Sequence, residues 1–201
     1  MKYILLIGLI TLTLSISAQN NVLKINEMLP AITEKMKNAL NDATVDLKSQ
    51  VKENGLLVIF SCNTCPFVVA WEDRYPMVNK LAEENNIGFV LINSNFMKRN
   101  DEDSWESMKK HAVKLKYKWP YLIDNESVVA NAFGAQTTPH VFLFDKELKL
   151  VYKGAIDDNY KDAAQVKEFY LKDAMQNLAN GKEITNKETR NLGCSIKRKT
   201  E

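Results

Sequence analysis

The sequence predicts an α/β fold in which a central mixed β-sheet is covered by helices on both faces. Two continuous apolar runs, 56–60 and 87–93, are typical of strands buried on both faces. A helical pattern follows each run, and a hairpin-like segment (141–152) and a helical segment (163–180) come after them. The order strand, helix, strand, helix, hairpin, helix predicts a sheet that combines parallel and antiparallel strands.

The elements of the first half follow from local patterns. Segments 36–40 and 44–47 flank the turn-forming pair Asn41-Asp42 and predict a short β-hairpin, with a helix over 32–40 as the competing prediction. After the first buried run, 67–85 is expected to be helical, with a kink or break at Pro76. Its expected inward positions are Ala70, Trp71, Val78 and Leu81.

The second half alternates short elements. Ser104 is a suitable N-cap for a helix whose apolar face carries Trp105, Met108, Ala112 and Leu115. A strand is expected at 121–123, and a short helix at 127–133 is ended by Gly134. Segments 141–144 and 148–152 surround a polar turn and predict an antiparallel hairpin. The inward face of the closing helix, 163–180, is expected to carry Val166, Phe169, Tyr170, Ala174 and Leu178.

Residues 1–18 have the order of a signal peptide: a lysine, an apolar stretch and small residues up to Ala18. The apolar stretch is shorter than the roughly 18–20 residues that span a bilayer, so cleavage is expected rather than a permanent anchor. The remaining chain predicts one domain over 19–184 and a C-terminal tail over 185–201. A periplasmic or secreted protein is therefore expected, in a compartment where disulfides persist.

Composition excludes some partners. The chain has 27 basic and 25 acidic side chains, and 45% of its residues are apolar. This near balance of charge gives no reason to expect nucleic acid or an anionic membrane surface as a partner. The apolar content is sufficient for one domain with its own core.

Cys62 and Cys65 form a C-x-x-C pair where the first apolar run gives way to a helix. The start of a helix stabilises a thiolate through its free N–H groups and its dipole. Two intervening residues also allow the sulfurs to form an intramolecular disulfide. The pair therefore predicts a redox centre, although the spacing alone also fits a static disulfide or half of a zinc site.

A second motif, Thr138-Pro139, stands directly before the apolar strand of the hairpin. A C-x-x-C after a buried strand, Thr-Pro before a hairpin and a closing helix resemble the thioredoxin superfamily. Within it, the chain is similar to extracytoplasmic thioredoxin-like and redoxin proteins related to the alkyl hydroperoxide reductase/thiol-specific antioxidant family. The similarity covers roughly 42–180, with matching stretches at 119–124 and 154–159 and, as in one thioredoxin-like subgroup, at 193–197.

The resemblance implies a thioredoxin-like fold and a thiol–disulfide oxidoreductase that acts on protein dithiols or disulfides and needs no cofactor. Cys62, at the exposed start of the helix, would be the attacking thiol, and Cys65 would be the resolving thiol. The Thr138–Pro139 bond would be cis and would present the Thr138 backbone to a substrate.

The chain also departs from the thioredoxin pattern. Many thioredoxins carry a buried acid six positions before the first cysteine, where this chain has Leu56. Glu72 is a candidate substitute acting through water, but a surface carboxylate is the favoured interpretation.

Two histidines and a third cysteine are the remaining candidates for a role at the site. His140 is expected to be an exposed groove residue, with tuning of Cys62 or metal ligation as alternatives, and His111 is given no role. Cys194 is the odd cysteine of three, expected either to resolve a disulfide at Cys62 or to be a buried or capped tail thiol.

Two further functions compete with the leading one. The redoxin-like framework suggests a thiol peroxidase, but such sites carry Thr or Ser three positions before the cysteine, where this chain has Ile59 or Cys62. Paired thiolates and a histidine suit Cu(I) and suggest a copper-binding module. The related copper proteins space their cysteines by three residues, and no set of metal ligands is predicted here.

Overall fold

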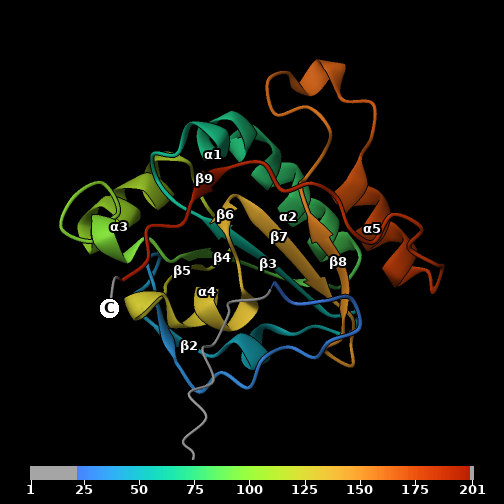
Figure 1. Ribbon diagram of the computed structural model, residues 1–201, viewed down its shortest axis with the longest axis horizontal. Coiled ribbons are helices and arrows are strands. Elements are labelled where there is room, and N and C mark those ends of the chain that lie inside the picture. Colours follow the sequence, from blue (N-terminus) through green and yellow to red (C-terminus); the bar gives the residue numbers. More distant parts are fainter. Residues whose placement is uncertain (1–21, 200–201) are drawn as a thin grey trace, which may run out of the picture.

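The computed structural model describes residues 22–199, so the predicted signal peptide lies outside the described residues (Figure 1). Seven strands form one sheet in the order β2-β1-β5-β4-β3-β7-β8, and β6 pairs with β9 in a second ladder. The elements are β1 Met36–Asn38, β2 Thr44–Val45, β3 Leu56–Ser61, α1 Pro66–Trp71, α2 Tyr75–Glu84, β4 Gly88–Asn93, α3 Trp105–Lys114, β5 Tyr121–Ile123, α4 Val128–Phe133, β6 Thr137–Thr138, β7 His140–Phe144, β8 Leu150–Gly154, α5 Tyr170–Ala179 and β9 Cys194–Ser195.

The sheet is mixed, as the element order predicts. β3 runs parallel to β4, and β4 runs parallel to β5, whereas β7 is antiparallel to β3. The predicted N-terminal hairpin is confirmed by antiparallel pairing of Met36 with Val45. Within residues 22–199, no helix is long and apolar enough to cross a membrane.

Side chains of β3 alternate between two cores, because successive residues of a strand point to opposite faces of the sheet. Leu57 and Ile59 lie in the core formed with α1, α2, α3 and α5. Leu56, Val58 and Phe60 lie in the core formed with α4 and the N-terminal segment. Every residue of β3 is therefore buried, and the helices cover both faces of the sheet (Figure 1).

Four phenylalanines anchor α4 to its face of the sheet. The ring of Phe133 meets Phe60 and Phe142 edge to face, each with a centroid distance of 5.3 Å. It also meets Phe144 at 5.7 Å. Offset and edge-to-face aromatic pairs contribute beyond their buried area, so Phe133 is a central contact of this core.

Most local predictions are confirmed. Ser104 caps α3 by accepting a hydrogen bond from the Ser107 N–H, and Gly134 ends α4 in the left-handed region at φ 61°. The break in the helix after the cysteines comes at residues 72–74, and Pro76 lies in the first turn of α2. A proline is tolerated there because the first N–H groups of a helix have no intrahelical partner.

The closing helix is shorter than predicted. It begins at Tyr170, whereas Ala163–Gln165 form a 3₁₀ turn. Local hydrogen bonds compete with the helix: Asp162 accepts from the Ala164 N–H and Asp158 from the Lys167 N–H. The buried face of α5 carries Leu171, Ala174 and Met175, with Tyr170 and Leu178 packed against the same core. Phe169 is 40% exposed, so the prediction that it faces inward was wrong, and Val166 is half-buried but lies before the helix.

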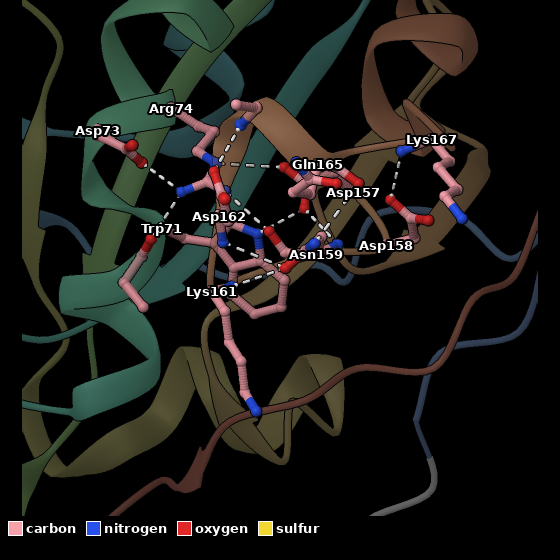
Figure 2. Close-up of polar contacts among 12 residues, drawn as sticks. Trp71, Asp73, Arg74, Asp157, Asp158, Asn159, Lys161, Asp162, Gln165 and Lys167 are labelled. Carbon is pink, nitrogen blue, oxygen red and sulfur yellow. Dashed lines mark hydrogen bonds and ion pairs between the residues drawn. The ribbon is translucent and has the colours of Figure 1, made fainter.

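A buried ion pair fixes the loop between β8 and α5 to the junction of α1 and α2 (Figure 2). Arg74 Nε lies 3.4 Å from Asp157 Oδ2, and both side chains are 5% exposed. Trp71 Nε1 donates to Asp157 Oδ1 at 3.0 Å, and Arg74 Nη2 donates to the Asn159 carbonyl at 2.8 Å. These contacts join the C-terminal end of α1, the helix that begins directly after Cys65, to the loop that follows β8.

Replacing Phe133 with alanine should destabilise the fold by about 3–5 kcal/mol, because a large buried side chain is lost and a cavity remains. Urea unfolding should show a lower midpoint with an unchanged slope. The control is Val113→Ala on α3, where the side chain is 74% exposed, and it should change stability by no more than about 0.5 kcal/mol. Equal effects of the two variants would contradict the packing role of Phe133.

Candidate active site

The two cysteines lie where β3 passes into α1. Cys62 directly follows Ser61, the last residue of β3, and Cys65 is the N-cap of α1 with Pro66 in the first turn. Cys62 is only 2% exposed and Cys65 is 6% exposed. The expectation that Cys62 lies at an exposed helix start was wrong: Cys62 lies in the turn between β3 and α1, where it packs with Cys65 and Val68, and Phe67 and Cys194 pack against this cluster.

Thr138 lies against both cysteines. The Thr138–Pro139 peptide bond is cis, as the resemblance implies. Thr138 Oγ1 is 3.3 Å from Cys62 Sγ, and Cys65 Sγ is 3.2 Å from the Thr138 carbonyl oxygen, to which it donates when it is protonated. Thr138 therefore contacts both cysteines although it lies more than seventy positions after them in the chain.

The third cysteine joins the same cluster. Cys194 packs against Cys62, Cys65 and Val68. It lies on β9, which pairs antiparallel with β6 so that Cys194 is the register partner of Thr138. Figure 1 shows the C-terminal segment running from α5 past α1 and β6 towards α3. The segment that the sequence marks as a tail is thus packed on the domain as far as residue 199.

The environment lowers the pKa of one cysteine and raises the pKa of the others. The pKa of Cys65 is lowered to about 5, because the Cys62 thiol donates a hydrogen bond to its sulfur and further donors are the Cys194 thiol and the Val68 N–H. The hydrogen bond to Cys65, burial and the nearby Asp103 carboxylate raise the pKa of Cys62. Burial first, and then the Cys65 sulfur, raise the pKa of Cys194 to about 11.

A buried polar network fixes the residue that follows Cys62. Asn63 donates its backbone N–H to Asp103 at 2.9 Å and accepts from the Tyr121 hydroxyl at 2.8 Å. Asp103 also accepts from the amide groups of Asn93 and Asn95, at 2.7 and 2.8 Å. Because Asp103 is 1% exposed, its charge acts on the cysteine pair with little screening by water.

The other candidate residues have different surroundings from those expected. Leu56 is fully buried at the opposite end of β3 from the cysteines. Glu72 is not a free surface carboxylate, because its Oε1 lies 2.6 Å from His111 Nε2 and both side chains are mostly buried.

His140 is 2% exposed and therefore is not an exposed groove residue. Its Nδ1 accepts the Gln136 N–H at 3.2 Å, and burial lowers its pKa to about 3, so the ring is neutral at neutral pH. Across residues 22–199, no group of three or more His, Cys, Asp or Glu residues is arranged to hold a metal ion.

A pocket of about 180 Å³ opens beside the cysteines. Its lining includes all three thiols, together with Lys98, Glu102 and Lys197. The amine of Lys98 pairs with Glu102 at 3.0 Å, so charges of both signs border the opening. The site can therefore be reached from solvent through this pocket, although Cys62 and Cys65 are themselves buried.

Comparison with known families identifies the family of this chain. The model of the Redoxin family matches residues 24–169. The chain belongs to the Redoxin family. No curated protein sequence matches it.

Two solved structures resemble this redoxin over nearly its whole length. An uncharacterized conserved protein from Geobacillus kaustophilus is 32% identical, with 90% of this chain and 95% of that chain covered and a TM-score of 0.82. A hypothetical protein from Sinorhizobium meliloti is 28% identical, with 90% and 98% covered and a TM-score of 0.79.

More distant structures show the fold alone. A thioredoxin-like protein solved in its oxidized form is 17% identical, with 80% of this chain and 100% of that chain covered and a TM-score of 0.60. The predicted thioredoxin-like fold and the place of the chain among redoxins are thus confirmed. Family and fold support thiol oxidoreductase or peroxidase chemistry in general.

The polar network of Asp103 was not recognised from the sequence. Its members come from the Asn63 turn, the end of β4, the following loop and β5. One signal was present: Asn93-Ser94-Asn95 follows a buried strand, at the sheet edge where open α/β folds place their sites.

The pKa order can be measured by titrating the thiolate absorbance of the reduced protein. We expect one thiolate to form with a midpoint near pH 5, so that Cys65 is mostly ionised at neutral pH. Cys65→Ser should remove this transition, whereas Cys194→Ser should keep a transition well below that of an ordinary cysteine. If Cys62→Ser removed the acid transition and Cys65→Ser kept it, Cys62 would be the low-pKa thiol.

Proposed function

We propose that this redoxin is an exported thiol–disulfide oxidoreductase whose attacking group is the Cys65 thiolate. The observation that carries the proposal is the position of Cys65: it is the N-cap of α1, it packs against a second thiol, it lies beside the cis Thr138–Pro139 bond, and these surroundings lower its pKa. A thiolate is the nucleophile in disulfide exchange, so a low pKa keeps the group reactive at neutral pH.

The proposed order of the two thiols is the reverse of the one that the resemblance implies. Cys62 lies deeper, and the Cys65 sulfur and the Asp103 carboxylate disfavour its ionisation. A protonated, buried thiol is a poor first nucleophile. Once Cys65 is bonded to a substrate sulfur, its sulfur carries no negative charge. The main cause that raises the pKa of Cys62 is then removed, so Cys62 can ionise and attack.

The reaction proceeds in two exchanges. The Cys65 thiolate attacks a disulfide RS–SR′, forms a Cys65–SR bond and releases R′S⁻, which takes a proton from solvent. Cys62 then attacks Cys65 Sγ, and its proton leaves with the departing RS⁻. The substrate disulfide becomes two thiols and the cysteine pair becomes a disulfide, and the reverse sequence oxidises a dithiol.

The substrate class and the compartment belong to the proposal. Protein dithiols and disulfides are the proposed substrates, and a second redox protein would restore the starting state. Export is supported by the order of charged, apolar and small residues in 1–18.

A single turnover with an aromatic disulfide that releases a chromogenic thiol tests the roles. The reduced wild type should release two leaving groups per molecule, and Cys65→Ser should react at least about 10²-fold more slowly. Cys62→Ser should keep the first release at a rate close to that of the wild type, because Cys65 is intact.

The outcomes separate the alternatives. Loss of the first release in Cys62→Ser, with Cys65→Ser active, would restore the order implied by the resemblance. An unreactive wild type, or a fully active double variant of Cys62 and Cys65, would refute the oxidoreductase proposal.

Peroxide consumption distinguishes the redoxin-type peroxidase. We expect hydrogen peroxide to oxidise the reduced protein no faster than it oxidises a free cysteine thiolate, because Cys62 stands three positions before Cys65, where peroxidatic sites carry Thr or Ser. Stopped-flow mixing measures the rate. A rate that exceeds that of free cysteine by about 10²-fold or more, and that is lost in Cys65→Ser, would favour the peroxidase instead.

A further inference from the structure

The C-terminal segment forms a strand against the residue that precedes the cis-proline. Thr138 pairs with Cys194 and Thr137 with Ser195 in the antiparallel register of β6 and β9. The Ile196 N–H donates to the Gln136 carbonyl at 3.0 Å, which extends this pairing by a further contact. An extended strand of the chain therefore lies beside the Thr138 backbone, next to Cys65.

The residues before and after β9 are also held in place. The Lys197 N–H donates to the Asn95 side chain at 2.9 Å, and its carbonyl accepts the Met97 N–H at 2.9 Å. Upstream, the Asn191 side chain donates to the Thr137 hydroxyl at 3.0 Å. Contacts on both sides place the segment in a defined register, so the position of Cys194 is set by the backbone around it.

The strand approaches β6 more closely than a side chain at residue 193 would allow. A Cβ added to Gly193 would lie 2.4 Å from the Thr138 carbonyl oxygen. Glycine at position 193 therefore permits β9 to lie directly against β6. The next residue, Cys194, is placed beside Thr138 by this close approach.

We propose that β9 is a built-in substrate strand whose Cys194 forms a disulfide with Cys65. This inference rests on the proposed function, and it adds a third redox thiol to the site. Cys194 packs against the cluster that contains Cys62 and Cys65, it is the register partner of Thr138, and its thiol and backbone N–H help to lower the pKa of Cys65, so Cys194 and Cys62 compete for the same partner. Cys194 is half-buried and lies nearer to solvent than the pair.

The exchange is balanced in atoms and electrons. In the mixed disulfide Cys65–SR, Cys194 attacks Cys65 Sγ, a Cys65–Cys194 bond forms and RS⁻ leaves with the proton of Cys194. Cys62 can then attack the same Cys65 sulfur, which forms the Cys62–Cys65 disulfide and returns Cys194 as a thiol. The second step only moves a disulfide within the protein, and no further oxidant or reductant is consumed.

Peptide mapping after mild oxidation tests the inference. The reduced full chain is oxidised with diamide, quenched in acid, alkylated and digested with trypsin, which leaves Cys62 and Cys65 in peptide 53–74 and Cys194 in peptide 191–197. A Cys65–Cys194 disulfide joins two peptides, whereas a Cys62–Cys65 disulfide closes a loop in one. Cys62→Ser should give the joined pair at least about tenfold more abundantly than Cys65→Ser does.

The outcomes separate this inference from the proposed function. If the wild type forms the Cys62–Cys65 loop but Cys62→Ser never gives the joined pair, the inference fails and the oxidoreductase stands. If the wild type forms no intramolecular disulfide, the proposed function fails with it. If Cys65→Ser gives the joined pair more readily than Cys62→Ser, Cys194 is a partner of Cys62 and the assignment to Cys65 is wrong.

A glycine substitution tests the role of the strand without removing a thiol. In the Cys62→Ser background, Gly193→Ala should lift β9 from β6 and slow the joining of the two peptides by about tenfold or more. The control is Gly181→Ala, which places an alanine at a φ of 64° and strains the backbone after α5 but brings no atom within 4 Å of the added Cβ, so it should leave the rate unchanged. An unchanged rate in Gly193→Ala would overturn the proposal that β9 delivers Cys194.

Discussion

The structure of the site depends on Thr138, because this one residue contacts all three cysteines. Its hydroxyl lies against Cys62, its carbonyl accepts from Cys65, and its backbone is the register partner of Cys194. The last of these contacts depends on the close approach of Gly193 to the same carbonyl. Segments that are distant in sequence, namely the end of β3, the strand before the hairpin and the C-terminal segment, meet at this residue.

Much of the fold follows from patterns of a few residues. The uninterrupted apolar runs predict β3 and β4 because both faces of the sheet are covered, and Ser104 and Gly134 mark helix ends through local hydrogen bonding and backbone conformation. The same reasoning failed between 163 and 169, since aspartate side chains there bond to nearby backbone groups and keep an apolar, helix-compatible segment in a loop.

The site was predictable in its members but not in their surroundings. Spacing and the position after a strand indicate Cys62 and Cys65, and the proline motif indicates Thr138. The spacing of the cysteines does not encode how deeply each is buried. Cys62 lies in the turn after β3, packed with Cys65 and Val68, and Cys65 is the N-cap of α1. Asp103 reaches the turn after Cys62 only when the loop after β4 folds back onto Asn63, so the polar run after that strand indicates a site but not which acid enters it.

The docking of the C-terminal segment also links the redox state of the site to the stability of the chain. A disulfide between Cys62 and Cys65 closes a very short loop and restricts the unfolded chain little. A disulfide between Cys65 and Cys194 encloses most of the domain, and constraining a loop of about 100 residues reduces the entropy of the unfolded state by an amount equivalent to about 4.7 kcal/mol. Moving one bond between two neighbouring sulfurs would thus change how strongly the C-terminal strand is tied to the start of α1, while the folded contacts stay the same.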